Sequence, residues 1–256
     1  MWRSSVQIKT EGLILRTQDY KESDKLLTIL TKDAGVVMAY AGGASKLKNR
    51  FSCCASPLCY AEFVLFRNRD KCTVDSAEPK ELFFGIREDL VSLSYASYFC
   101  ELAMTCIPAE EPSEEILRLT LNTLYMLENK KRPPEQLKAI YELRLMSVSG
   151  FRPDLVACSE CGEYEKELFW FSPEEGRVCC GDCMPEAEPG RLPLSKSAFF
   201  AARHIAYAPD EKLFSFTVGG EALRELAAAA EQYALCRTER TYKTLDFLKG
   251  IEGMNT

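Results

Sequence analysis

The sequence predicts an α+β protein in which a small five-stranded β-barrel precedes an α-helical domain that carries a zinc ribbon. Short alternating strands fill the first 75 residues, apolar residues recur at helical spacing from about residue 81, and four cysteines form two C-x2-C pairs. The 256 residues, of which 46% are hydrophobic, suffice for two domains. We place them at residues 1–80 and 81–256, with the ribbon at about 156–186.

Five N-terminal segments have the composition of strands and are separated by turn residues. They are residues 8–17, 25–31, 35–40, 58–66 and 71–75. Five short strands at this spacing suit a small barrel such as an OB-fold, and an SH3-like barrel would give a similar string. The pattern predicts a barrel and leaves these two types open.

Helical periodicity follows the barrel. The predicted helices cover residues 88–107, 112–132, 135–148, 195–207 and 221–248, the last one with a break near Cys236. The sequence contains no phosphate-binding G-x-x-x-x-G-K-[ST], no G-x-G-x-x-G and no Ser/His/Asp set. We therefore expect a protein that is not an enzyme.

The two C-x2-C pairs are separated by 18 residues and comprise Cys158, Cys161, Cys180 and Cys183. This spacing is typical of a tetrahedral Zn²⁺ held by two knuckles, with a β-hairpin at residues 168–179 between them. A hairpin with little core of its own needs such a metal, and four thiolates leave no open coordination position. We predict one structural Zn²⁺ per chain, with Cys179 outside the ligand set because it breaks the x2 spacing.

Two other uses of these cysteines fit less well. A redox C-x-x-C pair normally starts a helix beside a βαβ unit, and none precedes Cys158. A catalytic zinc site or a nucleobase deaminase needs histidine ligands, and the only histidine is His204. The other eight cysteines are predicted to be small core residues or unpaired thiols: Cys53, Cys54, Cys59, Cys72, Cys100, Cys106, Cys179 and Cys236.

The net charge of −6 is distributed unevenly. Residues 1–80 carry 13 Lys and Arg against 9 Asp and Glu, a net of +4, whereas residues 81–256 carry 19 against 29, a net of −10. A polyanion would therefore be attracted to the predicted barrel. No apolar run approaches the ~20 residues of a membrane span, and the N-terminus does not resemble a signal peptide, so we expect the cytoplasm.

A glycine-rich segment between the third and fourth predicted strands carries three alternating cations, which an extended backbone would point the same way. Phe51 follows them, and cations beside a ring are typical of single-strand binding. The alternative is a solvated loop with Phe51 in the core. Further cations on the first two strands, Lys21 among them, extend the cluster. The predicted DNA-binding residues are Lys46, Lys48 and Arg50, with Arg16 and Lys25 as weaker additions.

Residues 11–16, 20–31 and Gly35 resemble the opening of the RecO family of bacterial DNA repair proteins. The Tyr-x-Glu-Ser-Asp stretch at residues 20–24 is the most specific part, and the Cys-x-x-Cys-Gly knuckle supports it. The order of parts agrees along nearly the whole chain. The resemblance implies an OB-fold for residues 1–80 and a zinc-bearing helical domain after it.

The resemblance also implies a recombination mediator associated with the nucleoid rather than an enzyme. Such a protein binds single- and double-stranded DNA, anneals complementary strands and, with RecR, helps load the RecA recombinase at gaps coated with single-strand binding protein. The family's glycine loop is close to Gly-Ala-Arg-Lys, whereas residues 43–46 are Gly-Ala-Ser-Lys and the whole chain is acidic. This departure favours DNA binding that a partner assists.

A site for the acidic tail of single-strand binding protein is a further implication, and it needs cations beside an apolar groove. The densest cations of the helical region suit it, with Leu117, Leu121 and Leu124 nearby; the alternative is that they only complement a helix dipole. The predicted partner-binding residues are Arg118, Lys130, Lys131 and Arg132.

Two competing function classes stay open. One is a zinc-ribbon adaptor or transcription-type regulator whose ribbon contacts DNA directly. Five glutamates in residues 163–177 argue against it, because they would repel the phosphates of DNA. The other is a thiol-dependent redox enzyme. One tightly held Zn²⁺ per chain would argue against this class, because the ion would occupy the thiols that such an enzyme requires.

Overall fold

The computed structural model describes residues 6–45, 54–68, 71–107 and 111–254. The chain forms two compact units, one made of residues 1–129 with 244–256 and the other of residues 130–243. The predicted domain boundary at residue 80 lies inside the first unit and stays a prediction. None of the helices in the described ranges has both the length and the apolar composition of a membrane span.

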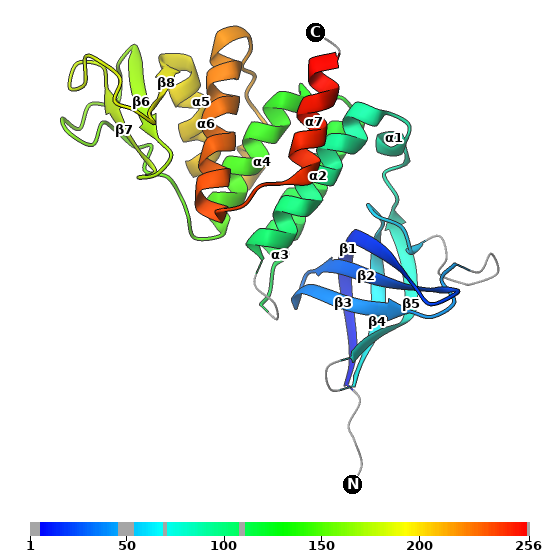
Figure 1. The fold of residues 1–256 in the computed structure, drawn as a ribbon. Helices are drawn as coiled ribbons and strands as arrows, with labels where there is room; N and C mark the ends of the chain where they lie inside the picture. Colours follow the sequence, from blue (N-terminus) through cyan, green and yellow to red (C-terminus); the bar gives the residue numbers. More distant parts are fainter. Residues whose placement is uncertain (1–5, 46–53, 69–70, 108–110, 255–256) are drawn as a thin grey trace. The chain divides into compact units, whose positions relative to one another are not determined.

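The first unit begins with a closed five-stranded barrel (Figure 1). Its strands are β1 (Val6–Tyr20), β2 (Asp24–Thr31), β3 (Gly35–Ala41), β4 (Tyr60–Asn68) and β5 (Lys71–Glu81). They pair in the order β1-β2-β3-β5-β4, β4 closes onto β1, and only the β3–β5 pair among them is parallel. The α+β fold class with an N-terminal OB-fold is confirmed.

Strand β1 pairs with two neighbouring strands because it bends. Its first half pairs with β4 and its second half with β2, and a bulge lies between Ile14 and Arg16. A Cβ at Gly12 would lie 2.7 Å from Cγ2 of Ile29 and 2.9 Å from the carbonyl oxygen of Leu30, so this crossing requires glycine. The barrel core is mainly aliphatic and includes Ile14, Leu27, Ile29, Val37, Ala39, Phe63 and Leu65.

Helices complete the first unit: α1 (Phe84–Arg87), α2 (Leu90–Cys106), α3 (Glu114–Glu128) and α7 (Lys243–Met254). Leu13 and Leu30 are paired across β1 and β2, on the side opposite the barrel core, and both are completely buried because α2 and α3 pack there. The start of α3 is fixed to the end of β2 by an ion pair of 3.0 Å between Lys32 and Glu114. Helix α7 joins α2 through Thr244, whose hydroxyl donates to Glu101.

The second unit combines helices with a three-stranded sheet. Its elements are α4 (Pro134–Val148), β6 (Leu168–Ser172), β7 (Arg177–Cys180), β8 (Leu192–Ser195), α5 (Lys196–Tyr207), the 3-10 turn η2 (Asp210–Lys212) and α6 (Gly220–Thr238). The strand order is β7-β6-β8, and all pairs are antiparallel. The ribbon packs onto the helices through Phe169, whose ring stacks on Phe199 of α5 at 3.9 Å.

The last predicted helix, residues 221–248, is two helices. Helix α6 ends at Thr238 because Glu239 adopts the left-handed conformation with φ of 51°, and α7 starts at Lys243. The prediction of a break near Cys236 is confirmed, since α6 ends two residues later, at Thr238.

Helix α4 is buried on every side, from Gln136 to Ser147. Its charged residues are paired: Lys138 lies 2.9 Å from both Glu142 and Glu231. Burial by itself would lower the pKa of Lys138, but the two carboxylates outweigh it and raise the pKa. The interior of this unit therefore contains a buried ionic cluster of one lysine and two glutamates.

Candidate metal centre and nucleic-acid interface

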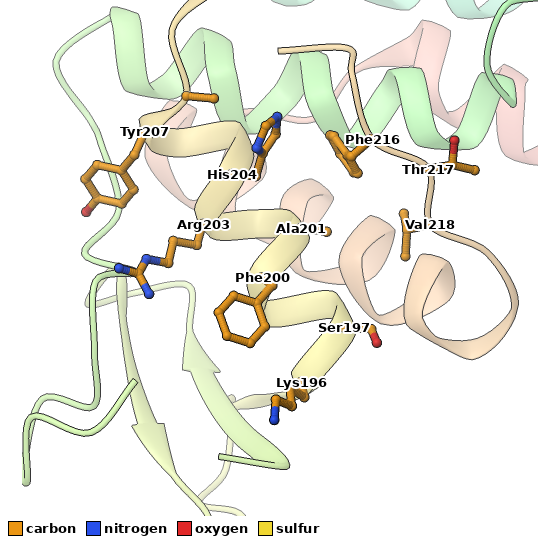
Figure 2. Close-up of a pocket in the computed structure, with 11 residues that line it drawn as sticks. Lys196, Ser197, Phe200, Ala201, Arg203, His204, Tyr207, Phe216, Thr217 and Val218 are labelled. Carbon is orange, nitrogen blue, oxygen red and sulfur yellow. The ribbon is translucent and has the colours of Figure 1, made fainter. Parts of the chain in front are cut away.

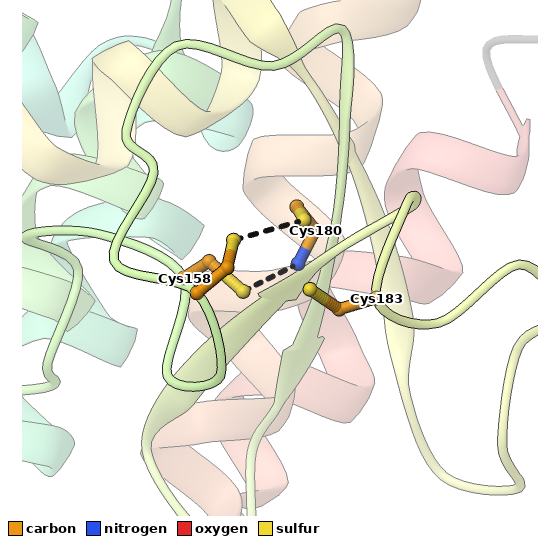
Figure 3. Close-up of side chains that lie close together, drawn as sticks. Cys158, Cys180 and Cys183 are labelled. Carbon is orange, nitrogen blue, oxygen red and sulfur yellow. Dashed lines mark hydrogen bonds between the residues drawn. The ribbon is translucent and has the colours of Figure 1, made fainter.

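Four cysteine thiols converge where the two knuckles of the ribbon face each other. The thiols belong to Cys158, Cys161, Cys180 and Cys183, their sulfur atoms all lie within 4.8 Å of one another, and Figure 3 labels three of them. The Sγ atoms of Cys161 and Cys180 are 3.7 Å apart. A tetrahedral site with metal–sulfur bonds of ~2.3 Å has sulfur–sulfur edges of about 3.8 Å. The four thiols can therefore hold one tetrahedral metal ion.

The backbone of the knuckles directs N–H groups at sulfur. The N–H of Cys180 donates to Sγ of Cys158 at 3.2 Å, and that of Glu160 does so at 3.5 Å. Burial by itself would raise the pKa of the Cys158 thiol, but the N–H donors of Cys180, Cys161 and Glu160 outweigh it and lower the pKa to about 6. These donors favour the thiolate form of Cys158, which is the form that binds a metal ion.

Cys179 lies beside this cluster. Its thiol is buried, 4.0 Å from Sγ of Cys158, and donates to the carbonyl of Cys180 at 3.7 Å. Burial and then the nearby Cys158 charge raise the pKa of Cys179 to about 11. The geometry groups Cys158 with Cys161, Cys180 and Cys183 and leaves Cys179 out, which agrees with the sequence spacing that placed Cys180 in the set instead.

The described part of the barrel contains only some of the predicted DNA-binding cations. Lys46, Lys48 and Arg50 lie outside the described residues, as does Phe51. Arg16 is exposed on β1 opposite Thr28, whereas Lys25 is half-buried and donates to the carbonyl of Ala55 at 3.3 Å. Arg16 can therefore reach a phosphate, while Lys25 also supports the barrel.

Sequence reasoning missed the outward face of β1, β2 and β3. Met38 and Tyr40 alternate with buried neighbours on β3, and Met38 is 59% exposed. The ladder places Tyr40 opposite Leu26, and Leu26 opposite Gln18. The ring of Tyr20 lies beside that of Tyr40, with centroids 4.9 Å apart. The period-2 alternation of residues 35–40 is the signal that could have revealed this face.

A pocket of about 830 Å³ lies beside α5 in the second unit (Figure 2). Phe200 and Arg203 come from α5, and Phe216 comes from the segment that follows η2. The ring of His204 packs against Phe216 with centroids 5.0 Å apart. None of these residues was a predicted site, because the pocket exists only once the two segments are brought together.

Comparison with known proteins identifies the family. Residues 5–83 match the model of the Recombination protein O N terminal, and residues 87–246 match that of its C terminal. The chain belongs to the RecO family. This result confirms the resemblance carried by the N-terminal motifs.

RecO relatives cover almost the whole chain. The DNA repair protein RecO of Acetivibrio thermocellus is 34% identical over 96% of this chain and 97% of its own. That of Symbiobacterium thermophilum is 34% identical over 93% and 95%, and that of Bacillus pumilus is 30% identical over 96% and 95%. The similarity therefore includes the barrel, the helices and the cysteine ribbon.

The predicted partner-binding cations of this RecO-family chain fall in both units. Arg118 is an exposed residue of α3 in the first unit, and residues 130–132 begin the second. Two of the leucines expected to line a groove, Leu117 and Leu124, are buried. They belong to the core and do not line an open groove.

Arg132 has a structural task in the second unit. Its guanidinium donates to the carbonyls of Phe214 and Phe216 at 2.8 and 3.0 Å. These contacts fix one wall of the α5 pocket, since Phe216 lines it. Lys130 and Lys131 are exposed.

Proposed function

We propose that this chain is a recombination mediator that acts in the cytoplasm, at the nucleoid, and that it is not an enzyme. It binds single- and double-stranded DNA, anneals complementary strands and, with RecR, helps load a recombinase at gaps coated with single-strand binding protein. The proposal is supported above all by a family match over nearly the full chain that places an OB-fold in its positively charged third.

Annealing requires contacts that reduce repulsion between phosphates and release the strands once they pair. A few cations on a barrel meet this requirement, because each contact is modest and weakens with salt. We assign the phosphate contacts to Lys46, Lys48 and Arg50, with Arg16 and Lys25 as weaker ones. The net charge of −10 on residues 81–256 favours DNA on the barrel over the rest of the chain.

Annealing of complementary oligonucleotides, and binding of one strand at several salt concentrations, test the proposal. We expect the full chain to accelerate annealing, and alanine at positions 46, 48 and 50 to reduce the salt slope by about one unit per lost contact. The control replaces three exposed cations of the second unit, Arg224, Arg240 and Lys243, by alanine. An unchanged slope in the barrel variant contradicts the assignment.

For the metal centre we propose a structural Zn²⁺ held by Cys158, Cys161, Cys180 and Cys183. The donor set and the 3.7 Å sulfur–sulfur edge support this identity, since Zn²⁺ prefers four thiolates in a tetrahedron. When bound, the ion closes the two knuckles and contributes folding free energy.

We also propose that the predicted cations bind the acidic tail of single-strand binding protein, with Lys130, Lys131 and Arg132 forming the site in the second unit and Arg118 of the first unit as a separate candidate contact. An acidic peptide with an apolar end, titrated into the full chain, should bind in the micromolar range, about −8 kcal/mol. Glutamate at positions 130 and 131 should weaken it. If this reversal has no effect while Arg203→Glu abolishes binding, the tail occupies the α5 pocket and the assignment is wrong.

A further inference from the structure

We propose that the outward face of β1, β2 and β3 is a stacking platform for unpaired bases of single-stranded DNA, with Tyr20 and Tyr40 as its rings. This inference rests on the proposed DNA-binding function. It deepens that function by assigning recognition of bases to residues separate from the phosphate-binding cations.

The two rings are placed where a base can reach them. Tyr20 is 40% exposed and Tyr40 is half-buried, and their planes are inclined by 58°. Met38, two residues before Tyr40 on the same face, adds a thioether that is 59% exposed. Rings and a polarizable sulfur offer apolar area that a base can cover.

The strand register makes this face continuous. One cross-strand row joins Arg16, Thr28 and Met38, and the next joins Gln18, Leu26, Tyr40 and Thr73. The rows place apolar groups beside a cation and short polar side chains. This mixture suits a polyanion with flat bases better than it suits a protein partner, for which a large uninterrupted apolar patch is expected.

A cation stands next to the rings. Lys21 begins the turn from β1 to β2, and its Nζ lies 5.4 Å from the centroid of the Tyr20 ring. Its φ of 54° is in the left-handed region, which favours glycine, yet the position carries a lysine. The ammonium group can bind the phosphate of a nucleotide whose base stacks on Tyr20. This strand face and first hairpin loop are where OB-folds bind oligonucleotides.

The inference is tested with two strands that carry the same number of phosphates: a thymidine 20-mer and an abasic 20-mer. We expect the full chain to prefer the thymidine strand, and alanine at positions 20 and 40 to weaken its binding about 5-fold or more per ring. The affinity for the abasic strand and the salt slope should not change. Phenylalanine at both positions should retain the preference, because the rings remain.

Two controls separate stacking from loss of structure. Tyr125→Ala removes a tyrosine that is 53% exposed on α3 and should leave the preference intact. Lys21→Gly should keep the turn, since glycine accepts positive φ, and should reduce the salt slope by about one unit. If the alanine variants unfold, photocrosslinking of a bromouracil strand to the unaltered chain decides, and we expect adducts at Tyr20 or Tyr40.

The outcomes are distinct. Three results would each overturn the platform and leave the proposed function standing. They are equal affinity of the unaltered chain for both strands, a preference that survives both alanine substitutions in a folded protein, and crosslinks only at residues other than Tyr20 and Tyr40. Failure to bind either strand at low salt overturns the proposed function and the platform with it.

Discussion

Single residues decide whether the metal centre forms. Cys180→Ser should remove bound metal and destabilise the ribbon, whereas Cys179→Ser should retain one ion per chain. The reason is that Cys180 belongs to the cluster of four converging thiols, while Cys179 lies outside that cluster. Elemental analysis of the purified variants measures this directly. Loss of metal on changing Cys179, with retention on changing Cys180, contradicts the ligand set.

Glu11 gives the barrel a dependence on pH. It accepts hydrogen bonds from Lys80 on β5 and Tyr60 on β4, and these partners, Lys80 first, hold its pKa below the ordinary 4.5. Because the folded pKa is the lower one, the stabilisation is fully present above pH 4.5 and is lost as the pH falls through the folded pKa.

The corresponding prediction compares the unaltered chain with Glu11→Gln. The difference between their free energies of unfolding should be largest near pH 7 and shrink towards pH 3, since only the carboxylate titrates. Urea denaturation at a series of pH values measures it. A difference that stays constant with pH shows that the charge of Glu11 is not what the barrel uses.

At the scale of elements, helix α4 depends on its ionic cluster. Lys138→Met leaves Glu142 buried without its cation, and we predict a loss of about 3–5 kcal/mol. The control is Lys9→Met, which breaks an equally short pair with Glu62 of 2.9 Å at the surface and should cost far less, because water screens an exposed pair. Chemical denaturation compares the two. Similar losses would show that burial does not set the difference.

Local sequence patterns predicted the elements whose periodicity lies within one segment. This was enough for the first four barrel strands and for helices α2 to α5, to within a few residues, whereas β5 continues six residues beyond the predicted end at residue 75. Strand β8 was missed because Pro193 lacks an N–H and its partner β6 lies about twenty residues earlier. The exact end of α6 was not predicted, because Glu239 is not a residue type that usually adopts the left-handed conformation.

The difference between patterns within one segment and contacts between distant segments also explains which sites were predicted from the sequence. The metal ligands come as two close pairs, so their spacing alone was informative. The Tyr20–Tyr40 pair forms only through the pairing of β1, β2 and β3, and the α5 pocket only when Phe216 meets α5. The alternation of residues 35–40 indicates an outward face of β3, but sequence spacing does not show that Tyr20 meets Tyr40 or that Phe216 meets α5.

At the scale of the whole molecule, the barrel depends on helices beyond residue 80. Leu13 and Leu30 are buried by α2 and α3, and burying one such side chain contributes about 1.5–3 kcal/mol. A chain that ends at residue 80 should therefore expose them, bind a hydrophobic dye and aggregate, whereas the full chain should not. A monodisperse fragment that binds no dye would show that residues 1–80 are self-sufficient.

Helix α7 has a consequence for how the protein is made. It packs in the first unit, with Leu245 and Leu248 buried, although residues 130–243 separate it from the rest of that unit. The ribosome must therefore translate all of residues 130–243 before the barrel-bearing unit has all its parts, while the second unit can fold earlier. A premature stop codon just before α7 would damage the unit that contains the barrel, although the codons of the barrel itself are intact.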